Sequence, residues 1–198
     1  MLKRLFDILF SLSGLIILSP LFIFICIAIL LESKGGAFYK QVRVGRNNTD
    51  FNLLKFRSMY VNADKKGLLT VGDKDNRITK VGYYIRKYKL DELPQLLNVL
   101  KGDMSFVGPR PEVRKYVSMY TQDQLKVLYV KPGITDPASI KYIDENRLLS
   151  QSQEPEKTYI EVIMPEKLRI NLEYINNQSF FYDLSIIFQT VFKVIHRG

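Results

Sequence analysis

Two adjacent carboxylates, Asp91 and Glu92, lie within the densest group of cations in the chain. A nearby positive charge lowers the pKa of a carboxyl group and keeps it ionised. An ionised aspartate can attack phosphorus, and it can also hold Mg²⁺ beside a diphosphate. Asp91 is therefore a candidate nucleophile or metal ligand. The competing interpretation makes Asp91 the N-cap of a short apolar helix predicted over 92–100.

Arginine side chains near this pair have the planar fork that grips phosphate oxygens. Arg86 precedes the carboxylates in a predicted basic helix over 81–89, and Arg110 follows them. Pro109 and Pro111 restrict the loop that presents Arg110. The alternative interpretation is that Arg86 and Arg110 are ordinary solvated surface residues.

Lys55 and Arg57 flank Phe56 at the end of a predicted strand. Side chains alternate along a strand, so both cations are expected on one face with Phe56 on the other. This pair either contacts a substrate phosphate or lines the exposed face of a half-buried strand.

A second acidic pattern, Asp73-Lys74-Asp75, lies in a polar stretch predicted to be a loop over 62–76. Many glycosyltransferases that use nucleotide sugars hold a divalent metal with an Asp-x-Asp pattern. The same spacing arises often by chance in polar loops. The chain also lacks the alternation of strands and helices that builds the usual nucleotide-binding sheet.

The composition narrows the chemistry further. The chain of 198 residues has 46% hydrophobic residues, a net charge of +9, one His and one Cys. Zinc sites built from His and Cys, intrachain disulfides and a well-placed histidine base are therefore excluded or unfavoured. The charge predicts an anionic partner. Nucleic acid is not the expected one, because no zinc finger, helix-turn-helix or RNP-like pattern is present.

Residues 8–31 contain no charged side chain, and as a helix they would be about 36 Å long. That length suffices to cross a bilayer core of about 30 Å. Ser19-Pro20 interrupts the run and requires a kink, and basic residues flank both ends. A spanning helix, a re-entrant hairpin with both ends in the cytoplasm and a buried soluble helix all remain open on the residues alone.

The rest of the chain is predicted to be mainly helical. A β-hairpin is expected from strands over 38–44 and 51–56, joined by turn-forming residues at 45–48. Further helices are expected over 112–128, from Pro165 onward and over 180–195, whereas the polar segment 146–157 is expected to be mobile. Apolar spacing makes 180–195 amphipathic, which suits either the bilayer interface or the core.

Four stretches, taken together and in order, resemble the bacterial monotopic polyprenyl-phosphate phosphoglycosyl transferases. They are Lys-Arg-Leu-Phe-Asp at 3–7 with Leu-Ser-Pro at 18–20, Lys-Phe-Arg-Ser-Met at 55–59, Lys-Leu-Asp-Glu-Leu-Pro-Gln at 89–95, and the run from Asn98 to Pro111. Lys-Pro-Gly-Ile-Thr at 131–135 extends the match, which covers residues 2–135 closely and the C-terminal helix more weakly.

The resemblance implies a fold and a reaction. Residues 1–33 would form a re-entrant membrane helix with its break at Ser19-Pro20. Residues 34–198 would form a compact, mainly helical catalytic domain on the cytoplasmic face of the bacterial inner membrane, with a small β-hairpin and amphipathic interfacial helices. Asp91 would attack the β-phosphorus of a UDP-sugar and release UMP, and polyprenyl phosphate would then accept the sugar phosphate.

The resemblance also implies roles for individual residues. Mg²⁺ would sit with Asp91, and Glu92 would orient the site or accept a proton. The substrate phosphates would be bound by a set of cations: Lys55, Arg57, Arg86 and Arg110. Membrane lipid is an implied partner, and a homo-oligomer is left open.

The chain departs from the family pattern in two places. Many members continue after Gly-Ile-Thr with Gly-Leu-Ala-Gln-Val-Asn-Gly-Arg, whereas this chain has Asp-Pro-Ala-Ser-Ile-Lys at 136–141. Asn171 stands three residues before Tyr174 where some members carry an aspartate. The sugar is therefore left open, as is the role of residues 136–160. Two alternatives are kept: an Asp-x-Asp glycosyltransferase that releases UDP, and a non-catalytic basic membrane adaptor.

Overall fold

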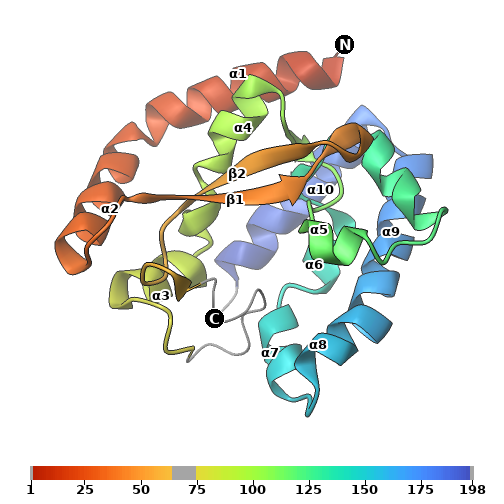
Figure 1. Ribbon diagram of the computed structural model, residues 1–198. Helices are drawn as coiled ribbons and strands as arrows, with labels where there is room; N and C mark the ends of the chain where they lie inside the picture. The colour runs from red at the N-terminus through yellow and green to blue at the C-terminus, as the bar shows by residue number, and fades with distance from the viewer. Residues whose placement is uncertain (1, 64–74, 197–198) are drawn as a thin grey trace.

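The N-terminal apolar segment forms two helices that meet at an angle. In the computed structural model, which describes residues 2–63 and 75–196, helix α1 (Leu2–Ile17) and helix α2 (Ser19–Glu32) are bent by 61° relative to each other. They form one edge of the molecule (Figure 1). No single helix within these two ranges is long and apolar enough to cross a membrane, although α1 and α2 pass that test as a bent pair.

The bend lies at the predicted break. Ser19 Oγ donates a hydrogen bond to the Ile16 carbonyl over 2.8 Å, and Pro20 occupies the first turn of α2. Proline has no amide hydrogen and its ring clashes with the preceding turn, so the helix cannot continue straight. The bend at Ser19-Pro20 is thus confirmed as a structural feature.

The predicted hairpin is also confirmed. Strand β1 (Phe38–Val44) pairs antiparallel with β2 (Asp50–Phe56), and a 3₁₀ turn at Arg46–Asn48 joins them. A second sheet, formed by β3 (Ser105–Val107) and β4 (Gly133–Thr135), is parallel and was not predicted. Strands of three residues carry too little alternation to stand out in a sequence.

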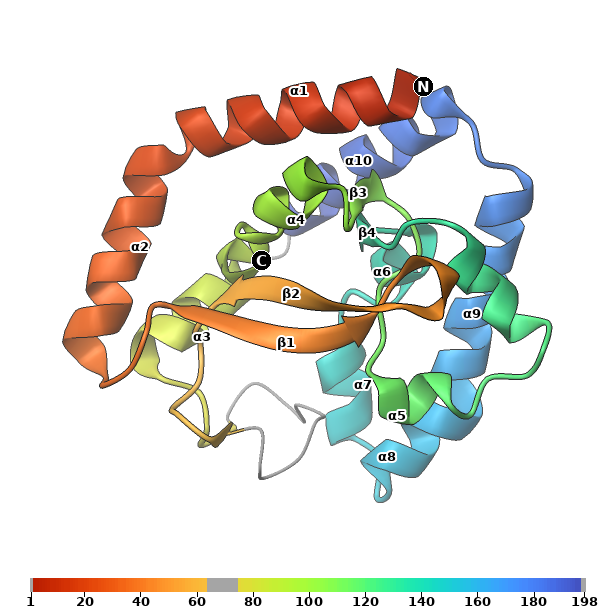
Figure 2. The ribbon, with the colours of Figure 1, turned by 45° about the horizontal axis from the view of Figure 1, so that its top comes forward.

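Short helices fill the space around the two sheets. They are α3 (Lys80–Lys87), α4 (Gln95–Lys101), α5 (Arg114–Val117), α6 (Pro137–Lys141), α7 (Glu145–Ser150) and α8 (Pro155–Thr158). Two longer helices, α9 (Met164–Asn176) and α10 (Phe180–Ile195), complete the chain, and Figure 2 shows α10 beside α1 and the hairpin between α1 and α7. Phe6 of α1 contacts Phe180 of α10 edge-to-face, with ring centroids 5.6 Å apart.

Two predicted segments differ in the structure. The prediction of one helix over 112–128 is wrong, because α5 ends at Val117 and a 3₁₀ turn follows at Gln124–Tyr129. The side chains of Thr121 and Gln124 each bond the other's backbone amide, which starts a new turn there. The segment 146–157 contributes to α7 and α8, because Leu149 is buried in the core.

The last two predicted helices are confirmed. Pro165 lies in the first turn of α9, although a π-helical turn at Tyr159–Ile163 precedes that helix directly. Helix α10 has the predicted bounds, and the Ser179 side chain caps it by accepting from the Tyr182 amide. The predicted loop over 62–76 lies mostly outside the described residues.

Candidate active site

Asp91 and Glu92 lie in a 3₁₀ turn, Leu90–Glu92, between α3 and α4. Lys89 adopts a left-handed conformation with φ = 56°, which reverses the chain after α3. Leu90 and Leu93 pack on the apolar cluster shared by α2, β2 and α3, so the turn is fixed from one side. The N-cap interpretation of Asp91 is wrong, because α4 begins at Gln95 after Pro94 and the Asp91 side chain makes no capping bond.

Glu92 binds two of the predicted cations. Its carboxylate accepts a hydrogen bond from Lys55 Nζ over 3.0 Å and is chelated by both terminal nitrogens of Arg110. Lys55 also lies 3.9 Å from Asp91 Oδ2. The hairpin and the Pro-Arg-Pro loop thus bring cations from distant parts of the chain onto one acidic pair.

The two carboxyl groups titrate in opposite directions. Burial raises the pKa of Asp91, and the negative charge of Glu92 adds to that effect, while Lys55 and Arg86 oppose it. Burial would also raise the pKa of Glu92, but the charges of Arg110 and Lys55 outweigh it and hold that pKa well below its usual range. The prediction that neighbouring cations lower the pKa is therefore correct for Glu92 and wrong for Asp91, where desolvation dominates.

Asp91 faces open space. It lines a cavity of about 590 Å³ together with Lys55, Arg86 and Arg110, and the volume is that of a pocket for a small-molecule ligand. Within residues 2–63 and 75–196, the Asp91 carboxylate accepts no hydrogen bond, and Lys55 at 3.9 Å is its ion-pair partner. A buried carboxylate with unused lone pairs beside cations is equipped to attack, or to ligate, a phosphorylated molecule.

Arg110 is held by a residue that the sequence analysis did not single out. The Arg110 amide donates to Asp136 Oδ2 over 2.8 Å, and the same aspartate caps α6 by accepting from the Ser139 amide. Asp136 is fully buried. The charge of Glu92 raises the pKa of Arg110, and Asp136 and Glu145 add smaller contributions, so Arg110 stays charged. The departure from the family pattern at residue 136 was the available signal for Asp136, but the sequence did not reveal that Asp136 binds the Arg110 amide.

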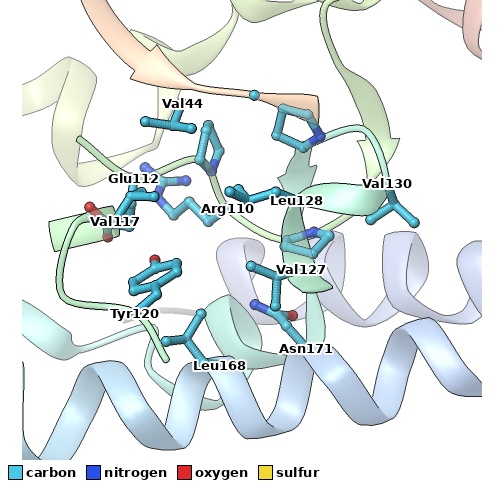
Figure 3. Close-up of a pocket in the computed structure, with 14 residues that line it drawn as sticks. Val44, Arg110, Glu112, Val117, Tyr120, Val127, Leu128, Val130, Leu168 and Asn171 are labelled. Carbon is cyan, nitrogen blue, oxygen red and sulfur yellow. The ribbon is translucent and has the colours of Figure 1, made fainter. Parts of the chain in front are cut away.

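A smaller cavity of about 30 Å³ lies behind the Pro-Arg-Pro loop (Figure 3). In this view Asn171 of α9 lies on the opposite side of the small cavity from the Arg110 guanidinium. Asn171 Oδ1 is buried and has no hydrogen-bond partner within the described ranges. The space suffices for a water molecule, and Asn171 does not line the cavity that Asp91 faces.

Arg57 has a different environment from the one predicted for a phosphate ligand. Its side chain is buried, and its terminal nitrogens donate to the carbonyls of Ser33 (2.8 Å) and Lys34 at the end of α2. Strand β2 ends at Phe56, and the Arg57 amide bonds to the Ala37 carbonyl, so strand alternation no longer directs the side chain. Although Arg57 borders the large cavity, its fork is occupied by the helix end.

The Asp-x-Asp pattern is only partly described, because Asp73 lies outside the described residues. Asp75 is paired with Arg77 over 2.6 Å, and this hydrogen bond lowers the pKa of Asp75. No group of three or more His, Cys, Asp or Glu side chains with metal-site geometry occurs within residues 2–63 and 75–196.

A magnesium ion nevertheless fits the donor set at Asp91. Mg²⁺ usually keeps several waters and binds through one or two carboxylates together with substrate phosphates. Asp91 offers unused carboxylate oxygens at the cavity wall, whereas Glu92 is engaged by Lys55 and Arg110. Asp91 is thus the acidic side chain of this pair that is suited to hold the ion.

Polar residues of α1 anchor the N-terminal helix to the rest of the molecule. Lys3 pairs with Asp183 of α10 over 2.6 Å, Arg4 donates to the last carbonyls of α4, and Asp7 accepts from the Phe106 amide of β3. In the sequence these residues belong to the Lys-Arg-Leu-Phe-Asp motif at 3–7, for which no role was predicted. Charged side chains in an otherwise apolar helix were the available signal.

Comparison with known proteins finds sequence similarity over nearly the whole chain. The family described as bacterial sugar transferase matches residues 1–197. An uncharacterized sugar transferase of Bacillus subtilis is 41% identical over 194 residues, which are 98% of this chain and 87% of the relative.

Two longer relatives carry more specific names. A UDP-N-acetylgalactosamine-undecaprenyl-phosphate N-acetylgalactosaminephosphotransferase of Aeromonas hydrophila is 37% identical over 98% of this chain. A UDP-glucose:undecaprenyl-phosphate glucose-1-phosphate transferase of Escherichia coli is also 37% identical over 98% of it. The chain spans 44% and 40% of the lengths of these two relatives, respectively. On the match over residues 1–197 the chain belongs to the bacterial sugar transferase family.

Proposed function

We propose that this protein transfers a sugar 1-phosphate from a UDP-sugar to polyprenyl phosphate, with release of UMP, through a covalent intermediate on Asp91. The observation that carries the proposal is the different environment of the two adjacent carboxylates. Glu92 binds Lys55 and Arg110, whereas the Asp91 carboxylate is buried, makes no hydrogen bond within residues 2–63 and 75–196, and faces a large cavity. The names of the longer relatives support the same donor and acceptor classes.

In the first half-reaction, an Asp91 carboxylate oxygen forms a bond to the β-phosphorus of the donor. The bond between that phosphorus and the oxygen bridging to the α-phosphate breaks, and UMP leaves with the electron pair. The raised pKa of Asp91 makes its carboxylate more basic than that of an ordinary aspartate, which favours attack. In the second half-reaction, an oxygen of polyprenyl phosphate attacks the same phosphorus and the carboxylate leaves.

The surrounding cations stabilise the charge on the phosphoryl oxygens. Lys55 lies between the two carboxylates, and Arg110 presents its fork from the stiffened loop. Arg86 lines the same cavity from α3. Glu92 keeps Lys55 and Arg110 in place before substrate arrives, which orients the cationic groups without filling the open side of Asp91.

Asp91 is the residue that we propose to hold Mg²⁺ together with the donor diphosphate. When bound, the ion supplies neutralisation of charge on the diphosphate oxygens. Glu92 contributes through its ion pairs instead. This assignment agrees with the unused oxygens of Asp91 and with the preference of Mg²⁺ for a small number of protein ligands.

The acceptor is a lipid, and we propose that the protein lies on the cytoplasmic face of the bacterial inner membrane with residues 1–33 as a re-entrant helix. Large apolar side chains are exposed along α1, α2 and one face of α10: Leu5, Leu9, Phe10, Ile16, Ile17, Ile23, Phe24, Ile27, Leu31, Phe181, Phe188, Phe192 and Ile195. Exposed apolar surface on this scale suits a membrane interface.

Cysteine labelling tests this topology. Leu2→Cys and His196→Cys are made separately in a Cys26→Ser background, because Cys26 is the native cysteine. In oriented inner-membrane vesicles, we expect an impermeant maleimide to label both positions from the cytoplasmic side. Labelling from opposite sides would contradict the re-entrant helix and favour a spanning one.

Nucleotide release tests the reaction. The protein in nanodiscs is given Mg²⁺, polyprenyl phosphate and a panel of UDP-sugars, and the released nucleotide is identified. We expect UMP from the wild type and none from Asp91→Asn. Asp123→Asn is the matched control, because Asp123 is exposed and lies in the exposed pair with Lys126. Omitting the acceptor should leave a sugar phosphate on the protein, detected as a mass increase that Asp91→Asn lacks.

The alternatives give different results. Release of UDP without a mass increase would support a direct glycosyltransferase, and no product from any donor would support the adaptor. Removing Arg110 should weaken transfer by about 1.5–3 kcal/mol, the value of one hydrogen bond to a charged group. Unchanged kinetics of Arg110→Ala would remove Arg110 from the site.

A further inference from the structure

The large cavity extends beyond the phosphate-binding cations to a second polar network. Glu112 Oε2 accepts from Arg43 over 3.3 Å, and Glu112 also accepts from the Tyr159 hydroxyl. Lys167 lies 5.6 Å from the centre of the Tyr159 ring and pairs with Glu145 over 2.8 Å. These five residues and Asn146 line the same cavity as Asp91.

The charges of this network differ from those around Asp91. Arg43 and Lys167 are matched by Glu112 and Glu145, so the network has no excess of charge. Around Asp91 and Glu92 there are three cations, Lys55, Arg86 and Arg110. A diphosphate therefore favours the Asp91 region, and the balanced network favours an uncharged ligand rich in hydrogen-bonding groups.

The donor and acceptor groups of the network are held in place. The Glu112 carboxylate is fixed from two sides, the Tyr159 ring is buried and packs against Tyr116 with centroids 5.0 Å apart, and Leu149 closes the core beneath α7. Sugar hydroxyls each donate and accept, so rigid carboxylate, ammonium and amide groups around one space are suited to discriminate their positions.

The network also has a suitable location. Its residues come from α7, α9, the π-helical turn at Tyr159–Ile163 and β1, and Glu112 lies in the loop before α5. Helix α7 lies across the hairpin from α1 (Figure 2). Glu145 lines the same cavity as Arg110 of the phosphate-binding loop. A group joined directly to the β-phosphate could reach this network while the apolar helices stay on the other side.

We propose that this network is the subsite for the sugar ring of the donor, and that Glu145 and Asn146 of α7 select among hexoses. The inference rests on the proposed transfer reaction, because it requires the phosphate attached to the sugar to lie at Asp91. It assigns the nucleoside to the rest of the cavity, near Tyr60 and Asn62.

Competition between donors tests the subsite. UMP release is measured from UDP-glucose, UDP-galactose and their N-acetylated counterparts for the wild type, Glu145→Gln and Asn146→Ala. We expect each variant to change the ratio of kcat/KM between the best donor and its epimer by about tenfold, the effect of one hydrogen bond to a charged or amide group. Glu154→Gln is the matched control, since Glu154 is an exposed carboxylate in the same segment, paired with Lys157, and should leave the ratios unchanged.

Binding provides an independent measurement. In an Asp91→Asn background, which should prevent turnover, the affinities of UMP and of the best UDP-sugar are measured by calorimetry. We expect the α7 variants to weaken the UDP-sugar about tenfold and to leave UMP unchanged. Equal weakening of both ligands would overturn the proposal by assigning the network to the nucleoside or to folding.

Different results would contradict the transfer reaction and the sugar subsite. A wild-type protein that releases no UMP would contradict the transfer reaction, and the calorimetry would still report on the subsite. A wild-type protein that releases UMP, with donor ratios that do not change in either α7 variant, would overturn the subsite and leave the reaction standing.

Discussion

Arg57 either caps the C-terminal end of α2 or binds a substrate phosphate. The substitution Arg57→Met, which nearly conserves volume, tells these two roles apart. In the structure the guanidinium donates to the Ser33 and Lys34 carbonyls, with a longer contact of 3.5 Å to Ile29. Methionine fills a similar space but removes both strong hydrogen bonds and the positive charge at the C-terminal end of α2.

The expected loss of stability follows from these contacts. A hydrogen bond to a charged group contributes about 1.5–3 kcal/mol, and the lower value applies because water can reach the Ser33 and Lys34 carbonyls after the change. Two such bonds give about 3 kcal/mol. For a chain of this size each kcal/mol shifts Tm by about 2–4 °C, so the expected decrease is about 6–12 °C.

Circular dichroism melting in nanodiscs measures this shift, and donor KM is measured on the same samples. Arg114→Met is the matched control, because Arg114 is 46% exposed and its ion pair with Asp50 should contribute under about 1 kcal/mol. A cap predicts a large decrease in Tm with little change in KM. An unchanged Tm together with a KM that rises tenfold would instead show that Arg57 binds phosphate through its remaining Nε.

Three further outcomes follow from the same geometry. Gly35→Ala should destabilise the protein in the same way, because Gly35 has φ = +118° and a Cβ there would lie 2.1 Å from Arg57 Nη1; a melt matching the wild type would contradict that contact. Asp91→Asn should melt at a higher temperature than the wild type at pH 7. A raised pKa of Asp91 means that the folded wild type loses stability as the pH rises above 3.8, so the difference in Tm should vanish when melts are repeated near that pH. Glu92→Gln should cost about 2 kcal/mol at pH 7, less than a fully buried pair because Arg110 is 30% exposed. In urea titrations the difference should shrink as the pH falls below 4.5, since a lowered pKa contributes its full stability above that value and loses it progressively below.

The sequence predicted the elements whose signals are local. The alternating residues of the hairpin, the apolar spacing of α10 and the proline at the start of α9 each reflect contacts within a few residues. The bend between α1 and α2 belongs to the same class, since proline acts on the turn directly before it.

The environment of the acidic pair could not be predicted in the same way. Whether burial or neighbouring charge controls the pKa of Asp91 depends on its depth in the fold and on Lys55, which approaches it only in the folded chain. Asp136 shows the same limit, because its bond to the Arg110 amide spans 26 residues. For Arg57, strand alternation was extrapolated one residue past the end of β2, where the chain turns toward α2.

The N-terminal helices are joined by polar contacts to the elements that carry the cations. Arg57 binds the end of α2 and follows Lys55 by two residues. Glu32, the last residue of α2, accepts from the first two amides of α3, the helix that bears Arg86, and Arg4 of α1 donates to the last carbonyls of α4. The faces of α1 and α2 that point outward are apolar, so a bilayer would contact one side of these helices while the other side fixes the site. Under the proposed reaction this arrangement holds Asp91 at a constant height relative to the lipid headgroups, where the phosphate of the acceptor must lie.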